Sequence, residues 1–152
     1  MPGDTNDRFT VGRFTVHGWK SMKIIRFEDI EAWQLARELT RMVYRLTKKQ
    51  AFGKDYGLKR QIQEAAGSSM HNIAEGFESE TNAEFIRFLR YAKRSCTEVQ
   101  SELYVALDEA YISRDEFDDT YEKARRTRAA IRGFINYLDK SKCRRENPTV
   151  EP

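Results

Sequence analysis

Apolar residues recur every three or four positions along most of the chain after Phe27, which is the spacing of a helix with one buried face. The pattern predicts four helices, over residues 29–50, 56–75, 81–110 and 113–141. The links between them are short, roughly two to six residues, so consecutive helices are expected to be antiparallel neighbours. The predicted fold is therefore all-α, an antiparallel up-down-up-down four-helix bundle over residues 27–141.

Local signals mark the ends of these helices. Thr81 with Glu84, and Ser113 with Glu116, have the spacing of capping boxes at two helix starts. Gly76 is predicted to end the second helix as a left-handed cap. Within that helix, the small residues 65–69 (AAGSS) predict the close approach of a neighbouring helix. Residues 51–55 are expected to form a loop.

The two ends of the chain differ from the bundle. Residues 1–26 are predicted to be an extended N-terminal arm, in which the β-leaning motif RFTV at residues 8–11 recurs at residues 13–16. An arm or translated leader outside the domain is the simplest interpretation, with Met22 as an alternative start. Residues 142–152 form a charged C-terminal tail that contains two prolines.

Composition narrows the class of protein. With 152 residues the chain suits a single domain, and 34% charged with 12% aromatic residues fits amphipathic helices with narrow apolar stripes better than disorder. No apolar run approaches the ~18 residues of a membrane span, and no signal peptide is recognisable. Two cysteines without a C-x-x-C motif favour a reduced, cytoplasmic compartment.

The chain lacks the usual signatures of catalysis. Neither His71 nor His17 has a Glu three residues earlier, so the Glu-x-x-His pairs of di-iron bundles are absent, and no metal or other cofactor is expected. Cys96 lies on the apolar stripe of the third helix, Cys143 has no partner histidine, and no phosphate-binding loop or dinucleotide motif occurs. His71 is interpreted as a structural or interface residue. We therefore expect no catalytic residue and no enzymatic activity.

The basic residues are distributed unevenly. Residues 113–122 carry five acidic groups against one basic, and residues 123–145 carry nine basic groups against one acidic. The helix dipole explains part of this division, but its effect fades beyond the last turn. Basic stripes are often only solvated faces; the alternative is a surface that attracts phosphate. The candidate nucleic-acid contacts are Arg37, Arg41 and Arg45 on the first helix, Arg87, Arg90 and Arg94 on the third, and Arg126 and Arg132 on the fourth.

A second apolar edge flanks the core stripe of the third helix, at about 90° from it. It consists of Ile86, Thr97, Tyr104 and Tyr111. These residues either cover the core of a single bundle or form a subunit interface, where tyrosine is common.

Four segments carry a resemblance to a known family: residues 27–34 (FEDIEAWQ), 56–58 (YGL), 72–77 (NIAEGF) and 84–89 (EFIRFL). Over about residues 24–140 the chain resembles the four-helix-bundle proteins of 23S rRNA intervening sequences, also called S23-type proteins. The resemblance implies a small bacterial cytosolic protein without enzymatic activity. It also implies a homopentameric ring, and related accessory proteins of diversity-generating retroelements bind nucleic acid and a reverse transcriptase.

The family motif includes Asn72, Glu75 and Gly76, which we interpret as structural. Glu75 is unfavourable at a helix C-terminus, so we expect it to pair with a basic residue, such as Arg60 or one on the third helix. Family members commonly have Pro where this chain has Met70, and the second helix is therefore expected to run straighter here.

Together these observations predict a non-enzymatic, homo-oligomeric binding module. RNA or another nucleic acid is the favoured ligand, bound through the basic helix faces. The alternative is a protein–protein interaction scaffold. No membrane partner is expected.

Overall fold

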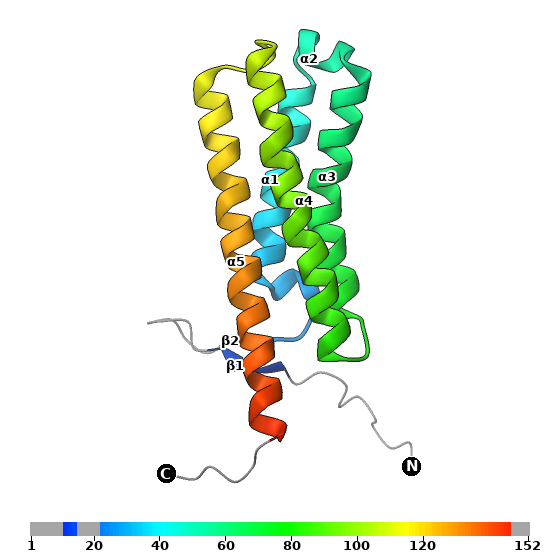
Figure 1. Ribbon diagram of the computed structural model, residues 1–152, viewed down its shortest axis with the longest axis vertical. Coiled ribbons are helices and arrows are strands. Elements are labelled where there is room, and N and C mark those ends of the chain that lie inside the picture. Colours follow the sequence, from blue (N-terminus) through cyan, green and yellow to red (C-terminus); the bar gives the residue numbers. More distant parts are fainter. Residues whose placement is uncertain (1–10, 15–21, 147–152) are drawn as a thin grey trace.

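The computed structural model describes residues 11–14 and 22–146 of the chain. Its four long helices run up and down along one axis (Figure 1). They are α1 (Glu31–Thr47), α3 (Tyr56–Phe77), α4 (Asn82–Asp108) and α5 (Arg114–Glu146). Helices α1 and α4 each pack against both α3 and α5, so α5 lies between α1 and α4. The predicted four-helix bundle is confirmed.

Shorter elements join the long helices. These are the antiparallel strands β1 (Val11–Phe14) and β2 (Met22–Ile24), the 3-10 turn η1 (Phe27–Asp29) and helix α2 (Gln50–Lys54). Ile24 is buried in the core, so the packed unit begins before the predicted boundary at Phe27. The predicted loop at 51–55 is mostly helix α2, because Phe52 is buried there and anchors the turn. The remainder of the predicted arm, residues 1–10 and 15–21, lies outside the described residues.

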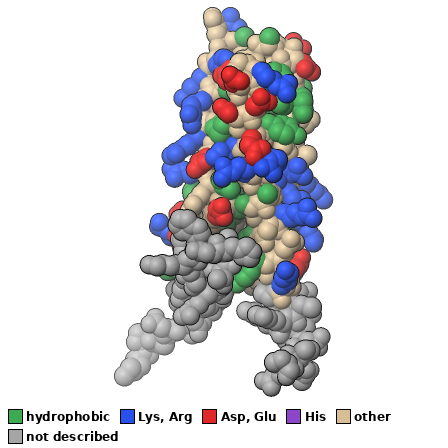
Figure 2. All heavy atoms as spheres, turned by 90° about the vertical axis from the view of Figure 1, so that its left-hand side faces the viewer, with side chains coloured by type: hydrophobic (Ala, Val, Ile, Leu, Met, Phe, Trp, Pro, Cys, Tyr) green, Lys and Arg blue, Asp and Glu red, His purple; other side chains and the backbone are tan. Residues whose placement is uncertain are grey.

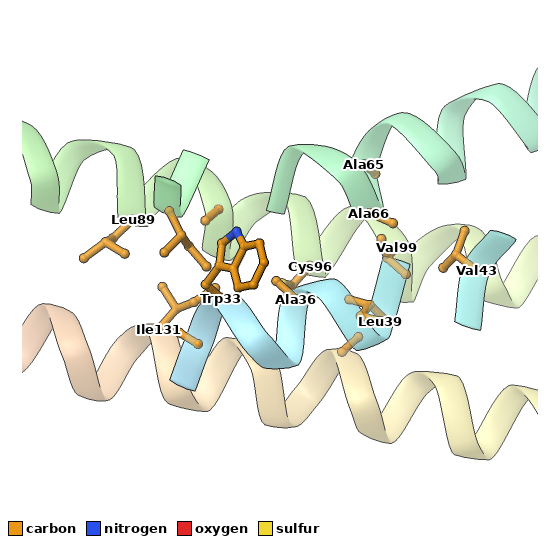
Figure 3. Packing of buried hydrophobic residues seen from close by; sticks show 14 of the residues in the cluster. Trp33, Ala36, Leu39, Val43, Ala65, Ala66, Leu89, Cys96, Val99 and Ile131 are labelled. Carbon is orange, nitrogen blue, oxygen red and sulfur yellow. The ribbon is translucent and has the colours of Figure 1, made fainter. Parts of the chain in front are cut away.

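Apolar side chains from all four long helices fill the space between them (Figure 3). Trp33, Ala36, Leu39 and Val43 come from α1, Ala65 and Ala66 from α3, Leu89, Cys96 and Val99 from α4, and Ile131 from α5. Each large side chain buried in this way contributes about 1.5–3 kcal/mol. The helical periodicity thus identified the buried faces correctly.

The small residues of α3 bring two helices close to it. The Thr40 hydroxyl of α1 donates to the Ala66 carbonyl at 3.0 Å, and the Ser95 hydroxyl of α4 donates to the Ser68 hydroxyl oxygen at 3.0 Å. Large side chains at these positions would keep the helix backbones apart. The predicted close approach is therefore present on two sides of α3.

Gly76 has a different role from the predicted one. It lies inside α3, which continues to Phe77, and its backbone is not left-handed. A Cβ atom at this position would lie 2.7 Å from Cδ2 of Phe85 and 2.8 Å from Cβ of Phe88. The prediction of a left-handed cap was wrong because glycine is required here by the close contact with α4.

The two predicted capping boxes mark real helix starts. The Glu84 amide donates to the Thr81 hydroxyl at 3.1 Å. Ser113 and Glu116 form the reciprocal pair, with each backbone amide donating to the other residue's side chain. Helix α5 then extends to Glu146, so the first residues of the predicted tail are helical.

The end of α4 has an unusual cap. The helix ends at Asp108 rather than at the predicted residue 110, and Ala110 has a φ of 57°. The Tyr111 amide donates to the Ala106 carbonyl at 2.9 Å, and the Ala110 amide donates to that of Leu107 at 3.0 Å. This is a Schellman motif with alanine at the position where glycine is preferred.

Two glycines within helices provide a matched test of the α3–α4 contact. Gly76→Ala forces Phe85 or Phe88 to move, and we expect it to lower the free energy of unfolding by about 1–3 kcal/mol. Gly133→Ala, in α5, meets no atom within 4 Å, and we expect it to raise stability by about 0.5–1 kcal/mol. Urea denaturation of both variants measures the difference. Equal changes in stability would contradict the close contact at Gly76.

Candidate nucleic-acid interface

All eight arginines predicted to contact nucleic acid are exposed. They lie on α1, α4 and α5, and α5 packs against the other two helices. The basic stripes therefore occupy three successive sides of the bundle rather than opposite ones.

The stripes of α1 and α5 meet at one carboxylate. The Lys123 ammonium of α5 donates to Glu38 of α1 at 2.5 Å. The pKa of Glu38 is lowered, first by this hydrogen bond and the Lys123 charge, and to a smaller extent by Arg126 and Arg41. Arg41 and Arg126 are thus close enough to act on the same group, and the two stripes form one basic surface.

The stripe of α4 lies beside the lower part of α5. The rings of Phe85 and Phe134 are 5.2 Å apart, in an edge-to-face contact between the two helices. Arg87 and Arg132 each lie two residues from one of these rings. Because residues rise only 1.5 Å each along a helix, the turns that carry the two arginines are at the same level of the bundle.

The view toward α5 shows this surface directly (Figure 2). Lysine and arginine side chains line both borders of that face and cross its middle, and acidic side chains gather mainly in the upper half. The division agrees with the acidic start and basic continuation of α5 in the sequence. On the part of this face that is visible, a phosphate backbone would meet lysine and arginine side chains along both borders and across the middle.

Few of these arginines are neutralised by a neighbouring acid. Within the described residues, Arg87 is the one of the eight that forms an ion pair, at 3.8 Å from Glu84. Arg125, by contrast, donates two hydrogen bonds to Glu122, at 2.7 and 2.6 Å. Arg125 is therefore a poorer candidate for phosphate binding than its neighbour Arg126.

A hollow of about 520 Å³ continues the basic surface at the far end of α1. Lys48, Lys49 and Lys59 line it, together with Tyr44 and Gln63. Lys59 was not a sequence candidate, because it comes from α3 and only the packing of α3 against α1 brings it beside Lys48. Lys49 is already paired with Glu116 at 2.5 Å.

The residues predicted to form a subunit interface do not lie along one exposed edge. Ile86 is only 5% exposed and belongs to the core of the bundle, because its position on α4 faces inward. Tyr111 follows the end of α4, where its ring stacks on Phe52 and its hydroxyl donates to Asp55 at 3.1 Å. Thr97 and Tyr104 are exposed, and the Tyr104 ring packs against those of Phe117 and Tyr121, with centroids at 4.9 and 5.8 Å.

In the family motif, Gly76 meets α4 directly, and Asn72 is linked to α4 only through Ser68. The Asn72 amide donates to the backbone and side-chain oxygens of Ser68, both at 2.9 Å, and Ser68 in turn accepts from Ser95 of α4. Glu75 is exposed, and no ion pair within residues 24–140 includes it, so its predicted basic partner is not found. Helix α3 runs without a break through Met70, as the absence of proline predicts.

The interior offers little reactive chemistry. Burial raises the pKa of the Cys96 thiol to about 12, so at neutral pH it is a thiol rather than a nucleophilic thiolate. In the described part of the chain, no group of three or more His, Cys, Asp or Glu side chains is arranged to hold a metal ion. None of the described helices has the length and apolarity needed to cross a membrane. His71 is exposed on α3.

Comparison with known proteins agrees with this geometry. Residues 28–133 match the family model of the 23S rRNA-intervening sequence protein. The chain belongs to this family. A crystal structure of a protein with unknown function from the S23 ribosomal protein family, from Bacteroides thetaiotaomicron VPI-5482, matches with a TM-score of 0.64 and 20% sequence identity. The match covers 69% of this chain and 95% of that one, and it supports the shared fold. A comparison with curated protein sequences gave no significant match.

One buried acid distinguishes the α3–α4 side of the bundle. Glu102 is 9% exposed, and its Oε2 atom has no hydrogen-bond partner among the described residues. Burial, and then the charges of Glu98 and Glu64, raise its pKa to about 7. The charges of Glu98 and Glu64 make the surroundings of Glu102 unfavourable for phosphate. Sequence periodicity missed Glu102 because it stands at the border of the apolar stripe.

The raised pKa of Glu102 predicts a pH-dependent penalty. The folded protein keeps the carboxyl protonated up to about pH 7, whereas an unperturbed carboxyl ionises near 4.5. Because the folded protein binds this proton more tightly than the unfolded chain does, protonation of Glu102 stabilises the fold fully below about pH 4.5. This stabilisation is lost as the pH rises through about 7, where the buried carboxyl must ionise. We expect Glu102→Gln to stabilise the protein by about 1–2 kcal/mol at pH 8 and to have little effect at pH 4.

Thermal or urea unfolding at the two pH values measures this effect. Glu80→Gln, in the exposed loop between α3 and α4, is the control and should give no pH-dependent gain. If Glu102→Gln stabilises the protein equally at pH 4 and pH 8, the Glu102 carboxyl does not change its ionisation between these two pH values. This result would contradict a pKa raised to about 7.

Proposed function

We propose that this protein is a non-enzymatic module that binds RNA through the arginine faces of α1, α4 and α5. The observation that supports it most strongly is the set of eight exposed arginines on three successive sides of one bundle, of which Arg87 alone forms an ion pair within the described residues. On a solvated helix face, opposite charges three or four residues apart can pair with each other. Within the described part of the chain, Arg41 of α1, Arg126 of α5, and Arg90 and Arg94 of α4 form no ion pair and are available to neutralise phosphates.

Binding of this kind is electrostatic and depends on salt. Each phosphate that an arginine neutralises releases counterions. For a single strand, a plot of the logarithm of the binding constant against the logarithm of the salt concentration therefore has a slope of about −0.7 for each phosphate contact. Such contacts position the RNA without reading its sequence. We therefore propose affinity for RNA backbones with little sequence preference from these arginines.

Self-association extends this surface. We propose that the protein forms a homo-oligomer, a pentameric ring as its family resemblance implies, in which basic faces of neighbouring copies lie close together. Exposed Thr97 and Tyr104 on α4 are the predicted interface residues that are available for such a contact. Adjacent copies would strengthen the field that attracts RNA.

A protein-interaction scaffold is the second candidate. The observation that favours it is exposed Tyr104 on α4, whose ring packs against buried Phe117 and half-buried Tyr121 of α5. Exposed tyrosines are common in protein interfaces. Capture of a protein partner that survives nuclease treatment, together with no binding of RNA, would support this function instead.

Paired substitutions separate the arginine faces from overall charge. We expect Arg90→Gln with Arg94→Gln, and Arg41→Gln with Arg126→Gln, each to weaken RNA binding and to reduce the salt slope by about 1.4, because each removes two phosphate contacts. Lys54→Gln with Arg60→Gln is the matched control, since it removes the same charge from exposed positions elsewhere.

Fluorescence anisotropy with a labelled 20-nucleotide RNA between 50 and 200 mM salt measures both quantities. The control should retain the slope of the unmodified protein. Absent binding, a slope near zero, or an equal loss in the control pair would overturn the proposed RNA interface.

A further inference from the structure

Tyr91 stands out on the exposed face of α4. Its side chain is 41% exposed and lies between arginines one turn before and one turn after it, Arg87 and Arg94. The Arg94 guanidinium lies 5.9 Å from the centre of the Tyr91 ring. Of the exposed tyrosines in the described chain, Tyr91 is the one with a cation placed over its ring.

Phe88 contacts the Tyr91 ring without burying it. Phe88 meets it edge-to-face, with centroids 6.2 Å apart and an interplanar angle of 89°. Phe88 is itself held against Gly76 of α3, at the position where no Cβ fits. Within residues 24–140, no hydrogen bond involves the Tyr91 hydroxyl. The ring is thus fixed in place while much of its surface stays open.

Such an arrangement suits an unpaired base. Proteins that bind single strands combine cationic groups that follow the backbone with aromatic rings on which bases stack. Arg94 lies over the Tyr91 ring at cation–π distance, and a nucleobase would take this position when Arg94 turns to a phosphate. In a duplex the bases are already stacked and paired, so the same ring could meet only the backbone.

We propose that Tyr91 stacks on an unpaired nucleobase, and that the α4 face therefore prefers single-stranded RNA to duplex RNA. This proposal rests on the proposed function, because Arg87, Arg90 and Arg94 supply the phosphate contacts on either side of the ring. It adds the class of nucleic acid and the residue that selects it.

Removal of the ring tests the preference. With a labelled 12-nucleotide RNA, we expect Tyr91→Ala to weaken binding of the single strand about fivefold to twentyfold, the lower part of the range for one stacked base. Binding of a blunt duplex of the same sequence should change less than twofold. Tyr91→Phe keeps the ring and should bind as the unmodified protein does, and Tyr56→Ala removes a 77% exposed tyrosine elsewhere as the control.

A spectroscopic variant reports stacking itself. In Tyr91→Trp we expect the single strand to quench the added tryptophan emission, relative to the protein with Tyr91, and the duplex to leave it unchanged. Single-stranded DNA of the same sequence should quench it as well, because stacking needs no 2′-hydroxyl. This measurement also covers the case in which Tyr91→Ala fails to fold.

The possible failures are distinct. If the unmodified protein binds neither RNA in a salt-dependent way, the proposed function is wrong and the stacking proposal falls with it. If it binds both RNAs with the expected salt slope, but Tyr91→Ala leaves single-strand binding unchanged or Tyr91→Trp is not quenched, only the stacking proposal is wrong.

Discussion

The close packing of α3 against α4 is the contact on which the rest of the molecule depends. Small residues on α3 allow it: Gly76 beneath Phe85 and Phe88, and Ser68 bonded to Ser95. With these two helices fixed, α1 and α5 complete the bundle and bury one apolar stripe each. The same contact holds Phe88, and through it Tyr91, at a fixed place on the outer surface. The contact of Gly76 with Phe88 between α3 and α4 thus helps to fix the position of Tyr91 on the surface.

The fold could be predicted from local pattern because each long helix has one apolar stripe and clear start signals, such as the reciprocal pair Ser113 and Glu116. What the pattern could not show depends on neighbouring helices. Gly76 has the spacing of a terminal cap, but the rings of α4 explain the glycine. Ile86 lies near the border of the stripe, and only the packed bundle shows that it is buried.

The sequence likewise predicts one part of the candidate nucleic-acid interface, and the packing of the helices determines the other. Periodicity placed the eight arginines outward, because residues opposite an apolar stripe face solvent. Which arginines lie together depends on contacts between helices, such as Lys123 with Glu38, which brings Arg41 and Arg126 to one carboxylate. Lys59 joins the basic hollow, and Glu102 comes near the charge of Glu64, by packing alone. Contacts between helices therefore decide which charges meet on the surface of this bundle, around an apolar core.

The most direct measurement of where RNA lies is hydroxyl-radical footprinting of the folded protein, with oxidation of each tyrosine quantified by mass spectrometry. Tyr91 on α4 and Tyr56 on α3 are both exposed, so both are oxidised in the free protein. If RNA lies along the arginine faces, its addition should protect Tyr91 and leave Tyr56 unchanged. Protection of Tyr56 with none at Tyr91 would contradict that placement.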